Sequence, residues 1–219
     1  SPNLINEVPH TLDKKIYEDI KDSFKEKNKI ELNYQIKNVH RAVGTRLSHY
    51  IFKKFGTDKI EKNSITINLV GSAGQSLGAF GIKGLKLNVI GDANDYVGKG
   101  LSGATIVIKP PKESNLVSNE NTIIGNTVLY GATSGKLFAA GQSGERFAVR
   151  NSGAESVVEG CDSNGCEYMT GGCVVILGKI GDNFAAGMTG GMAFIYDPEN
   201  EFENYVNPNS VIWQKPETD

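Results

Sequence analysis

The chain has 219 residues, which is long enough to bury a hydrophobic core without disulfide or metal staples. Its formal net charge is −2 and charged residues make up only 22% of it, so the composition offers no basic face for nucleic acid. No apolar run approaches the ~18 residues that a membrane span needs. The three cysteines are an odd number, which argues against a secreted disulfide scaffold and favours a reducing, cytoplasmic compartment.

Residues 1–60 have the pattern of a small α/β lead-in. Apolar residues recur at every fourth position of the segment 11–24, which predicts an amphipathic helix with Leu12, Ile16, Ile20 and Phe24 on its buried stripe. The segment 38–56 has the same spacing and predicts a second helix, capped by Gly56, with the stripe Val39, Val43, Leu47 and Ile51. Between them, residues 29–36 alternate apolar and polar side chains, which predicts a strand.

From Ile65 onward the sequence repeats a short β-type run, a turn with glycine and a closing glycine. Of its 26 glycines, all but Gly44 and Gly56 lie between Gly71 and Gly191. The β-type runs that begin the units are ITINLVG, LKLNVIG, ATIVIKP, KLFAAG, ESVVEG, VVILG and MAFIYD. The predicted turn glycines are Gly71, Gly91, Gly141, Gly160 and Gly178, and the predicted closing glycines are Gly84, Gly103, Gly135, Gly153, Gly172 and Gly191.

The closing glycines follow one another after 19, 32, 18, 19 and 19 residues. The long interval contains a polar stretch, Pro111–Thr122, which predicts a loop inserted into one unit. A period of about 19 residues predicts a solenoid of about seven units, each stacked on the next. Because the runs are β-branched and no proline occurs over residues 112–197, the units are predicted to be parallel β-coils over residues 61–197.

The last residues, 198–219, are predicted to be a C-terminal arm. The segment is polar overall, which is typical of a solvated tail. It also carries Phe202, Tyr205 and Trp213, and three aromatic side chains favour an arm docked on the last coil. The sequence leaves both alternatives open.

The stretch VGKGLSG, residues 97–103, spells G-x-G-x-x-G, which in dinucleotide-binding proteins joins a strand to a helix. Here the turn-like GDANDY precedes it and the β-type run ATIVIKPP follows, so no helix is predicted. Gly98, Gly100 and Gly103 are therefore interpreted as corner residues. The stretch GSAGQSLGAFG also precedes a β-type run and receives the same interpretation.

No constellation of side chains predicts a catalytic, cofactor or metal site. Cys161, Cys166 and Cys173 lack C-x2-C spacing and are interpreted as small buried residues of a β-core. The histidines have no second ligand at metal spacing, and two of them fall within the second predicted helix; they are His10, His40 and His49. The pattern also leaves open a paired acid and base among Asp92, Asp95, Glu145, Glu155, Glu159 and Glu167. Arg146 and Arg150 are interpreted as a solvent-facing or ion-paired edge.

Long phrases of the sequence resemble the C-terminal glycine-repeat (GXGXG) domain of the large (alpha) subunit of glutamate synthase. They are GSAGQSLGAFGIKGLKL, GDANDYVGKGLSGATIVI, IIGNTVLYGATSGKLF, GERFAVRNSGAESVVEG, GCEYMTGG and GDNFAAGMTGG. Upstream, NEVPHTLDKKI and NVHRAVGTRLSHYI are similar to the lead-in to that domain, so the resemblance runs from Asn6 to Asp197. The same glycine-repeat domain occurs in formylmethanofuran dehydrogenase, which these phrases resemble less closely.

The resemblance implies a right-handed β-helix that carries no catalytic residue. In complete glutamate synthase, a glutaminase domain releases ammonia, which passes through a tunnel to a synthase domain that makes glutamate from 2-oxoglutarate. That domain carries FMN and a 3Fe-4S cluster, with the cluster cysteines in its barrel, so this chain is expected to hold no cofactor. Its expected role is to hold its partners, the glutaminase and synthase domains, in register for ammonia channelling.

Other functions stay open from the sequence. A β-helix enzyme would need a cleft lined by aromatic side chains, whereas aromatic residues make up 8% of this chain and are scattered. A free-standing binding module, or a subunit of another redox complex such as formylmethanofuran dehydrogenase, would keep the fold without the glutamate synthase role. An isolated chain is also expected to expose apolar patches, through which it could form a homo-oligomer.

Overall fold

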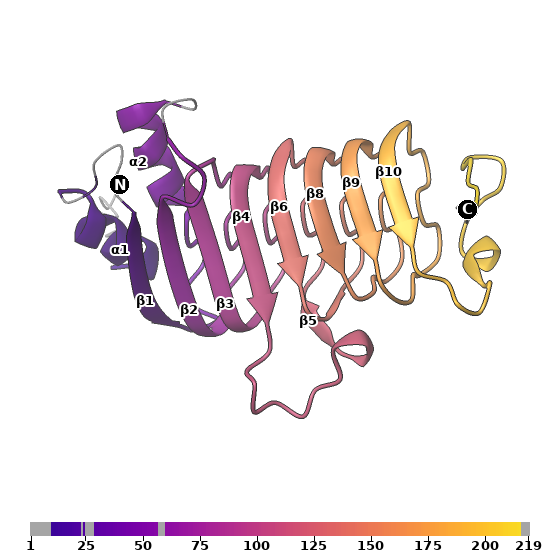
Figure 1. The fold of residues 1–219 in the computed structure, drawn as a ribbon, viewed down its shortest axis with the longest axis horizontal. Helices are drawn as coiled ribbons and strands as arrows, with labels where there is room; N and C mark the ends of the chain where they lie inside the picture. Colours follow the sequence, from indigo (N-terminus) through magenta and orange to yellow (C-terminus); the bar gives the residue numbers. More distant parts are fainter. Residues whose placement is uncertain (1–9, 23, 25–28, 57–59, 216–219) are drawn as a thin grey trace, which may run out of the picture.

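The computed structural model describes residues 10–22, 24, 29–56 and 60–215, which are mainly β with two α-helices. Ten strands form one sheet in which each named strand pairs with its neighbours in parallel (Figure 1). The main path is β1-β2-β3-β4-β6-β8-β9-β10, while β5 pairs with β3 and β7. The strands are β1 (Ile30–Ile36), β2 (Ile65–Ala73), β3 (Leu85–Ala93), β4 (Ser102–Lys109), β5 (Thr122–Ile124), β6 (Ser134–Ala139), β7 (Gln142–Ser143), β8 (Ser152–Val158), β9 (Thr170–Ile176) and β10 (Gly190–Ile195).

Residues about one predicted period apart in the sequence lie side by side in the sheet. Ile65 of β2 pairs with Leu85 of β3, and Lys136 of β6 pairs with Glu155 of β8. The predicted β-type runs form β2, β3, β4, β6, β8, β9 and β10, so these seven predictions are confirmed. The one long step is between β4 and β6, because the polar segment 111–121 loops away from the sheet there (Figure 1).

The turns that connect the strands carry left-handed residues at alternate positions. They are Ser76, Gly78 and Phe80; Tyr96, Gly98 and Gly100; Thr127, Leu129 and Gly131; Arg146, Ala148 and Arg150; Asn164, Cys166 and Tyr168; and Asn183, Ala185 and Gly187. A left-handed residue other than glycine costs roughly 1–2 kcal/mol. A conformation repeated at this cost indicates that the surrounding contacts enforce it.

Backbone hydrogen bonds between successive turns supply those contacts. In every turn but the last, the first N–H donates to the next turn, as Ser76 does to the Asp95 carbonyl at 2.9 Å. The second N–H donates to the preceding turn, as Gly98 does to the Leu77 carbonyl at 2.9 Å. The third again donates forward, from Gly100 to the Tyr130 carbonyl at 2.8 Å. Each turn is therefore bonded on both sides, as the strands are.

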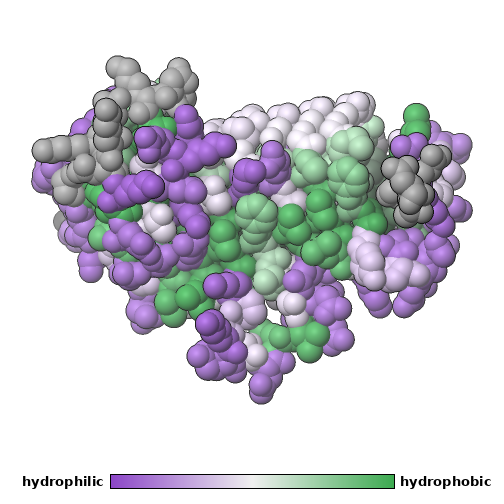
Figure 2. Space-filling model, in the orientation of Figure 1, coloured by the Kyte–Doolittle hydropathy of each residue, from purple (hydrophilic) through white to green (hydrophobic). Residues whose placement is uncertain are grey.

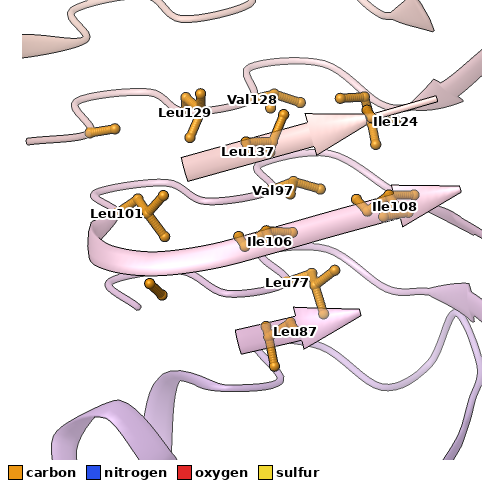
Figure 3. Close-up of a cluster of buried hydrophobic side chains, with 14 of the residues drawn as sticks. Leu77, Leu87, Val97, Leu101, Ile106, Ile108, Ile124, Val128, Leu129 and Leu137 are labelled. Atoms are coloured by element: carbon orange, nitrogen blue, oxygen red, sulfur yellow. The ribbon is translucent and has the colours of Figure 1, made fainter. Parts of the chain in front are cut away.

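The hydrophobic core fills the space between the sheet and the turns. Inward side chains of the strands, such as Ile106 and Leu137, are fully buried. Side chains from the turns, such as Val97 and Leu129, face them and are equally buried, and Figure 3 shows the resulting layers. Because each layer repeats the last, one continuous core runs along the chain from the helices to Phe184.

Both helices pack at the β1 end of this core (Figure 1). Helix α1 (Leu12–Ile20) confirms the first predicted helix and buries Ile16 and Ile20. Helix α2 (Thr45–Phe55) is shorter than predicted, because the chain turns at Gly44, whose φ is +98°. Val39 therefore lies outside the helix and is 78% exposed, so its predicted place on the buried stripe is wrong.

The C-terminal arm packs on the last turn. The Phe202 ring lies edge-on to Phe184, with 6.2 Å between centroids, and to Trp213, with 5.6 Å. The Tyr205 carbonyl accepts a hydrogen bond of 3.0 Å from the Phe184 N–H. Of the two alternatives that the sequence left open, the arm is therefore docked. Neither helix within the described residues has the length and apolar character that crossing a lipid bilayer requires.

Candidate interaction surface

The predicted glycines lie inside the strands or within two residues of their ends. Those inside strands are Gly71, Gly91, Gly103, Gly135, Gly153, Gly172 and Gly191. Gly84 and Gly141 directly precede β3 and β7, whereas Gly160 and Gly178 follow β8 and β9. The stretch VGKGLSG leads into β4 rather than a helix, so the geometry that a dinucleotide fingerprint requires is missing.

Two of these glycines show what the positions require. Gly91 has φ +146°, and a Cβ added to it would collide with the carbonyl oxygen of Gly71 in the neighbouring strand. Gly153 has no positive φ, yet a Cβ there would collide with the carbonyl oxygen of Thr133. Both positions leave no room for a side chain between adjacent strands, so glycine permits the close stacking.

Asn151 is a structural residue that the sequence reasoning missed. It is fully buried just before β8, where the pairing of β8 with β9 shifts register between Ser152 and Glu155. Its Oδ1 accepts hydrogen bonds from the N–H groups of Gly153 (3.2 Å) and Ala154 (2.9 Å), and its Nδ2 donates to the Ala154 carbonyl (2.9 Å). The side chain thus satisfies backbone groups that the register shift leaves without strand partners.

The three cysteines lie in two different environments. Cys161 and Cys166 are buried, and burial raises the pKa of the Cys161 thiol to about 12 and that of Cys166 well above its usual value. Cys173 is only half-buried and points to the outside of β9, so its predicted place in the core is wrong. Such thiols do not fit an iron–sulfur cluster, which needs convergent thiolates.

The histidines do not form a metal site either. His10 and His40 line an open hollow of about 430 Å³, and His40 Nδ1 accepts a hydrogen bond of 3.1 Å from the Lys37 N–H. His49 is exposed on α2. Across the part of the chain that the structure describes, no three His, Cys, Asp or Glu side chains gather in a group that could hold a metal ion. The hollow is lined by His10, Thr11, Leu12, Lys14, Lys15, Glu18 and His40.

Several of the candidate carboxylates hold neighbouring turns and strands together. Asp95 accepts a hydrogen bond of 2.8 Å from the Asn126 N–H in the next turn, and Glu167 accepts one of 2.8 Å from Asn164 Nδ2. Glu155 forms an exposed ion pair with Lys136 on the adjacent strand. The contacts of Asp95 and Glu155 join neighbouring repeats, whereas that of Glu167 lies within one turn, and none of them pairs an acid with a base.

Further candidates lie at the surface. Asp92 accepts a hydrogen bond of 3.1 Å from the Ser72 hydroxyl and lines a second hollow, of about 290 Å³. Arg146 and Arg150 are exposed, as the edge interpretation predicts, and Arg150 lies over the Tyr168 ring. Glu145 and Glu159 lie in loops outside the named strands.

The face of the sheet turned away from the core, here called the outer face, begins with a polar ladder. Asn33, Asn68 and Asn88 occupy paired positions on β1, β2 and β3. Asn68 Nδ2 donates to Asn33 Oδ1 at 3.0 Å, and Asn88 Nδ2 donates to Asn68 Oδ1 at 2.8 Å. The polar groups of this asparagine ladder therefore bond to one another along the sheet.

The same register row becomes apolar from β4 onward. Its members pair strand by strand and are Val107, Phe138, Val157, Val175 and Phe194. Phe138 is 39% exposed and Phe194 is 46% exposed. Figure 2 shows the resulting apolar surface over the later strands. The part of the outer face from β4 to β10 is called the apolar half below, and it is the candidate interaction surface.

Comparison with known proteins places this architecture in a family. The chain is 64% identical over 210 residues to the glutamate synthase [NADPH] large chain of Azospirillum brasilense. The aligned region covers 96% of this chain and 14% of the relative. It is 52% identical over 197 residues to a ferredoxin-dependent glutamate synthase of Pyropia yezoensis, with 90% and 13% covered. A glutamate synthase [NADH] of Schizosaccharomyces pombe is 50% identical over 200 residues, with 91% and 10% covered.

The chain thus spans only 10–14% of the length of these relatives. The family of the GXGXG motif matches residues 13–219, a range that includes all of α1 except Leu12, the whole of α2 and all ten described strands. Because this match extends over nearly the whole sequence, the chain belongs to the GXGXG motif family.

Proposed function

We propose that this chain is the C-terminal structural part of a glutamate synthase large chain and that it performs no catalysis by itself. The observation that carries the proposal is 64% identity over 96% of this chain to a large chain of which it covers only 14%. The rest of such a polypeptide has room for the glutaminase and synthase domains. In this proposal the chain holds those two domains in register, so that ammonia released by one reaches the other.

The fold that we propose for this role is a right-handed parallel β-helix over residues 61–197, with 1–60 as its lead-in and 198–219 as its arm. Consecutive strands pair in parallel after one period, and the turns bond to each other in the same order. Parallel crossovers between such strands are right-handed in about 98% of cases, which supports the handedness. A stack bonded on two sides resists bending, as a spacer between two active sites must.

The cofactors and location follow from the same proposal. FMN and the 3Fe-4S cluster belong to the synthase domain and not to this chain, whose thiols Cys161 and Cys166 are buried and protonated at neutral pH. The structural glycines, among them Gly91 and Gly153, serve the close stacking of strands. The proposed compartment is the cytoplasm, where free cysteines persist.

The test uses the full-length large chain that contains this sequence, assayed with glutamine and 2-oxoglutarate. Ile106→Asp places a carboxylate at a fully buried position and is expected to disrupt the stack. Glutaminase activity and flavin absorbance should remain, while the ratio of glutamate formed to free ammonia released should fall. Lys86→Ala, at a partly exposed outward position on β3, is the matched control and should keep the wild-type ratio.

Two results would contradict the proposal. The first is an Ile106→Asp enzyme with a disrupted β structure, seen by circular dichroism, that still delivers its ammonia to 2-oxoglutarate as the wild type does. The second is a full-length chain that carries this sequence but binds no flavin and makes no glutamate. Either result would leave the description of the wild-type fold unchanged and would remove the proposed link between that fold and ammonia coupling.

A further inference from the structure

The exposed apolar side chains of the apolar half adjoin one another and form a continuous surface, unlike the isolated apolar residues found on most protein surfaces. Beside the apolar row, the flanking positions on the last strands carry Met192 (56% exposed), Leu177 (47%) and Tyr196 (62%). Leu177 directly follows β9 and Tyr196 directly follows β10, so they continue the outer face at its edge. Neighbouring strands lie only about 4.8 Å apart, so these side chains adjoin those of the row. Large contiguous apolar patches of this kind mark interaction sites.

Charge is confined to the margin of this surface. Lys136 and Glu155 lie two residues before Phe138 and Val157 on their strands, and they neutralise each other in an ion pair. Along the row itself, no charged residue stands between Val107 on β4 and Phe194 on β10. A partner for this surface is therefore apolar and uncharged at its centre, as in a permanent interface.

The asparagine ladder sets the limit of the surface. It occupies the same row on β1 to β3, but its amides bond to one another. A partner that covered the ladder would gain apolar burial there only from Val70 and Ile90 beside it, and it would also displace water from the remaining amide groups. The partner is thus expected over β4 to β10 alone.

From these observations we infer that the apolar half packs against another part of the same, longer polypeptide. This inference rests on the proposed function, in which the chain is part of a large chain some seven to ten times its length, since it covers 10–14% of its relatives. A covalently linked domain meets this surface at an effective concentration of order millimolar, far above that of a second copy.

The test is site-specific photo-crosslinking in the full-length chain. The photoreactive residue p-benzoylphenylalanine replaces Phe138 in one variant and Phe194 in another, an aromatic-for-aromatic change at each end of the apolar row. The matched control carries it at Asn88, in the same row on β3 but within the asparagine ladder. After irradiation, digestion and mass spectrometry, Phe138 and Phe194 should link to peptides outside residues 1–219, and Asn88 should not.

Isotope labelling separates this result from pairing between copies. Equal amounts of ¹⁵N-labelled and unlabelled chains are mixed before irradiation, and same-chain links then contain only one label. Mixed-label links from Phe138 or Phe194 would assign the surface to a second copy and overturn the inference. So would the absence of any link from both positions, or links from Asn88 to the same peptides.

This readout is independent of the proposed function, since it needs no turnover. If the links join the same chain while Ile106→Asp leaves ammonia coupling unchanged, the interface stands and the coupling role fails. If coupling depends on the stack but neither position links, the interface is wrong and the coupling role stands.

Discussion

The Asp13 carboxylate on α1 accepts a 2.7 Å hydrogen bond from the backbone N–H of Gly44, the residue directly before α2. Its second oxygen accepts one of 2.9 Å from the N–H of Arg46 in the first turn of α2. Gly44 has no side chain with which to cap that helix, so a carboxylate from the neighbouring helix takes the role of the cap. Asp13 is only 7% exposed, so no water readily replaces it.

Removing this carboxylate should destabilise the β1 end of the molecule. We expect Asp13→Ala to lower the free energy of unfolding by about 1–2 kcal/mol, because the buried N–H of Gly44 and the partly buried N–H of Arg46 lose their acceptor. The exposed Asp22→Ala, just beyond the end of α1, is the control and should change it by less than about 0.5 kcal/mol. Urea denaturation measures both, and equal midpoints for the two variants would contradict the capping role.

Substitution of Asn151 should reduce stability as much as substitution of Asp13, although Asn151 lies far from any helix. We expect Asn151→Ala to cost about 1–3 kcal/mol, because the N–H groups of Gly153 and Ala154 are left without an acceptor. Asn119→Ala, in the exposed inserted loop, is the matched asparagine control. Thermal unfolding compares them, and an unchanged midpoint for Asn151→Ala would show that the register shift holds without this side chain.

The sequence was sufficient to predict the strands and their period, because apolar alternation reports directly which side chains face the core. The runs from ITINLVG to MAFIYD all form strands, and the inserted loop lies where the interval between glycines lengthens. The predicted position of Cys173 in the core was wrong, because the alternation of inward and outward side chains along a strand places it on the outer face. Its neighbours Val174 and Ile176 point inward, so Cys173 points out.

The turns could not be predicted in the same way. Leu129, Arg146 and Cys166 adopt a left-handed conformation that their side chains disfavour, so local preference gives no signal for it. Hydrogen bonds to the neighbouring turns impose it, and these exist only once the stack has formed. The candidate surface was beyond prediction for a related reason. It depends on strand register, which places Val107 beside Phe138 although 31 residues separate them in the sequence.

Ser156 provides a test in the opposite direction, where a substitution should stabilise the chain. Its side chain points into the core between Leu137 and Val174 of the adjacent strands, and its hydroxyl is buried with no hydrogen-bond partner among the described residues. We expect Ser156→Ala to raise the free energy of unfolding by about 1 kcal/mol, because the desolvation cost disappears. In Ser152→Ala, by contrast, a hydroxyl that donates to the Ala132 carbonyl is lost, and stability should not rise. A lower stability for Ser156→Ala would mean that its hydroxyl has a partner.

The cysteines should differ in reactivity as they differ in burial. At pH 8, iodoacetamide should modify Cys173 in the native 219-residue chain, whose outer face is uncovered, whereas Cys161 and Cys166 should react only after unfolding. Burial keeps both of these thiols protonated and out of reach of the reagent. Mass spectrometry of the labelled peptides measures this order. Rapid native labelling of Cys166 would show that the core opens at the turn that contains it.

The raised pKa of Cys161 also predicts how stability depends on pH. An unfolded thiol ionises near its ordinary value of 9.0, while the folded Cys161 has its pKa raised to about 12 by burial. Between these values the unfolded state releases a proton that the folded state keeps, so this contribution to stability is complete below pH 9 and is lost as pH rises toward 12. Lysines and tyrosines titrate in the same range, so the comparison is between wild type and Cys161→Ala, measured by urea denaturation from pH 8 to pH 11. Stability should fall more steeply with pH in the wild type, and parallel curves would show that Cys161 ionises at the same pH in both states.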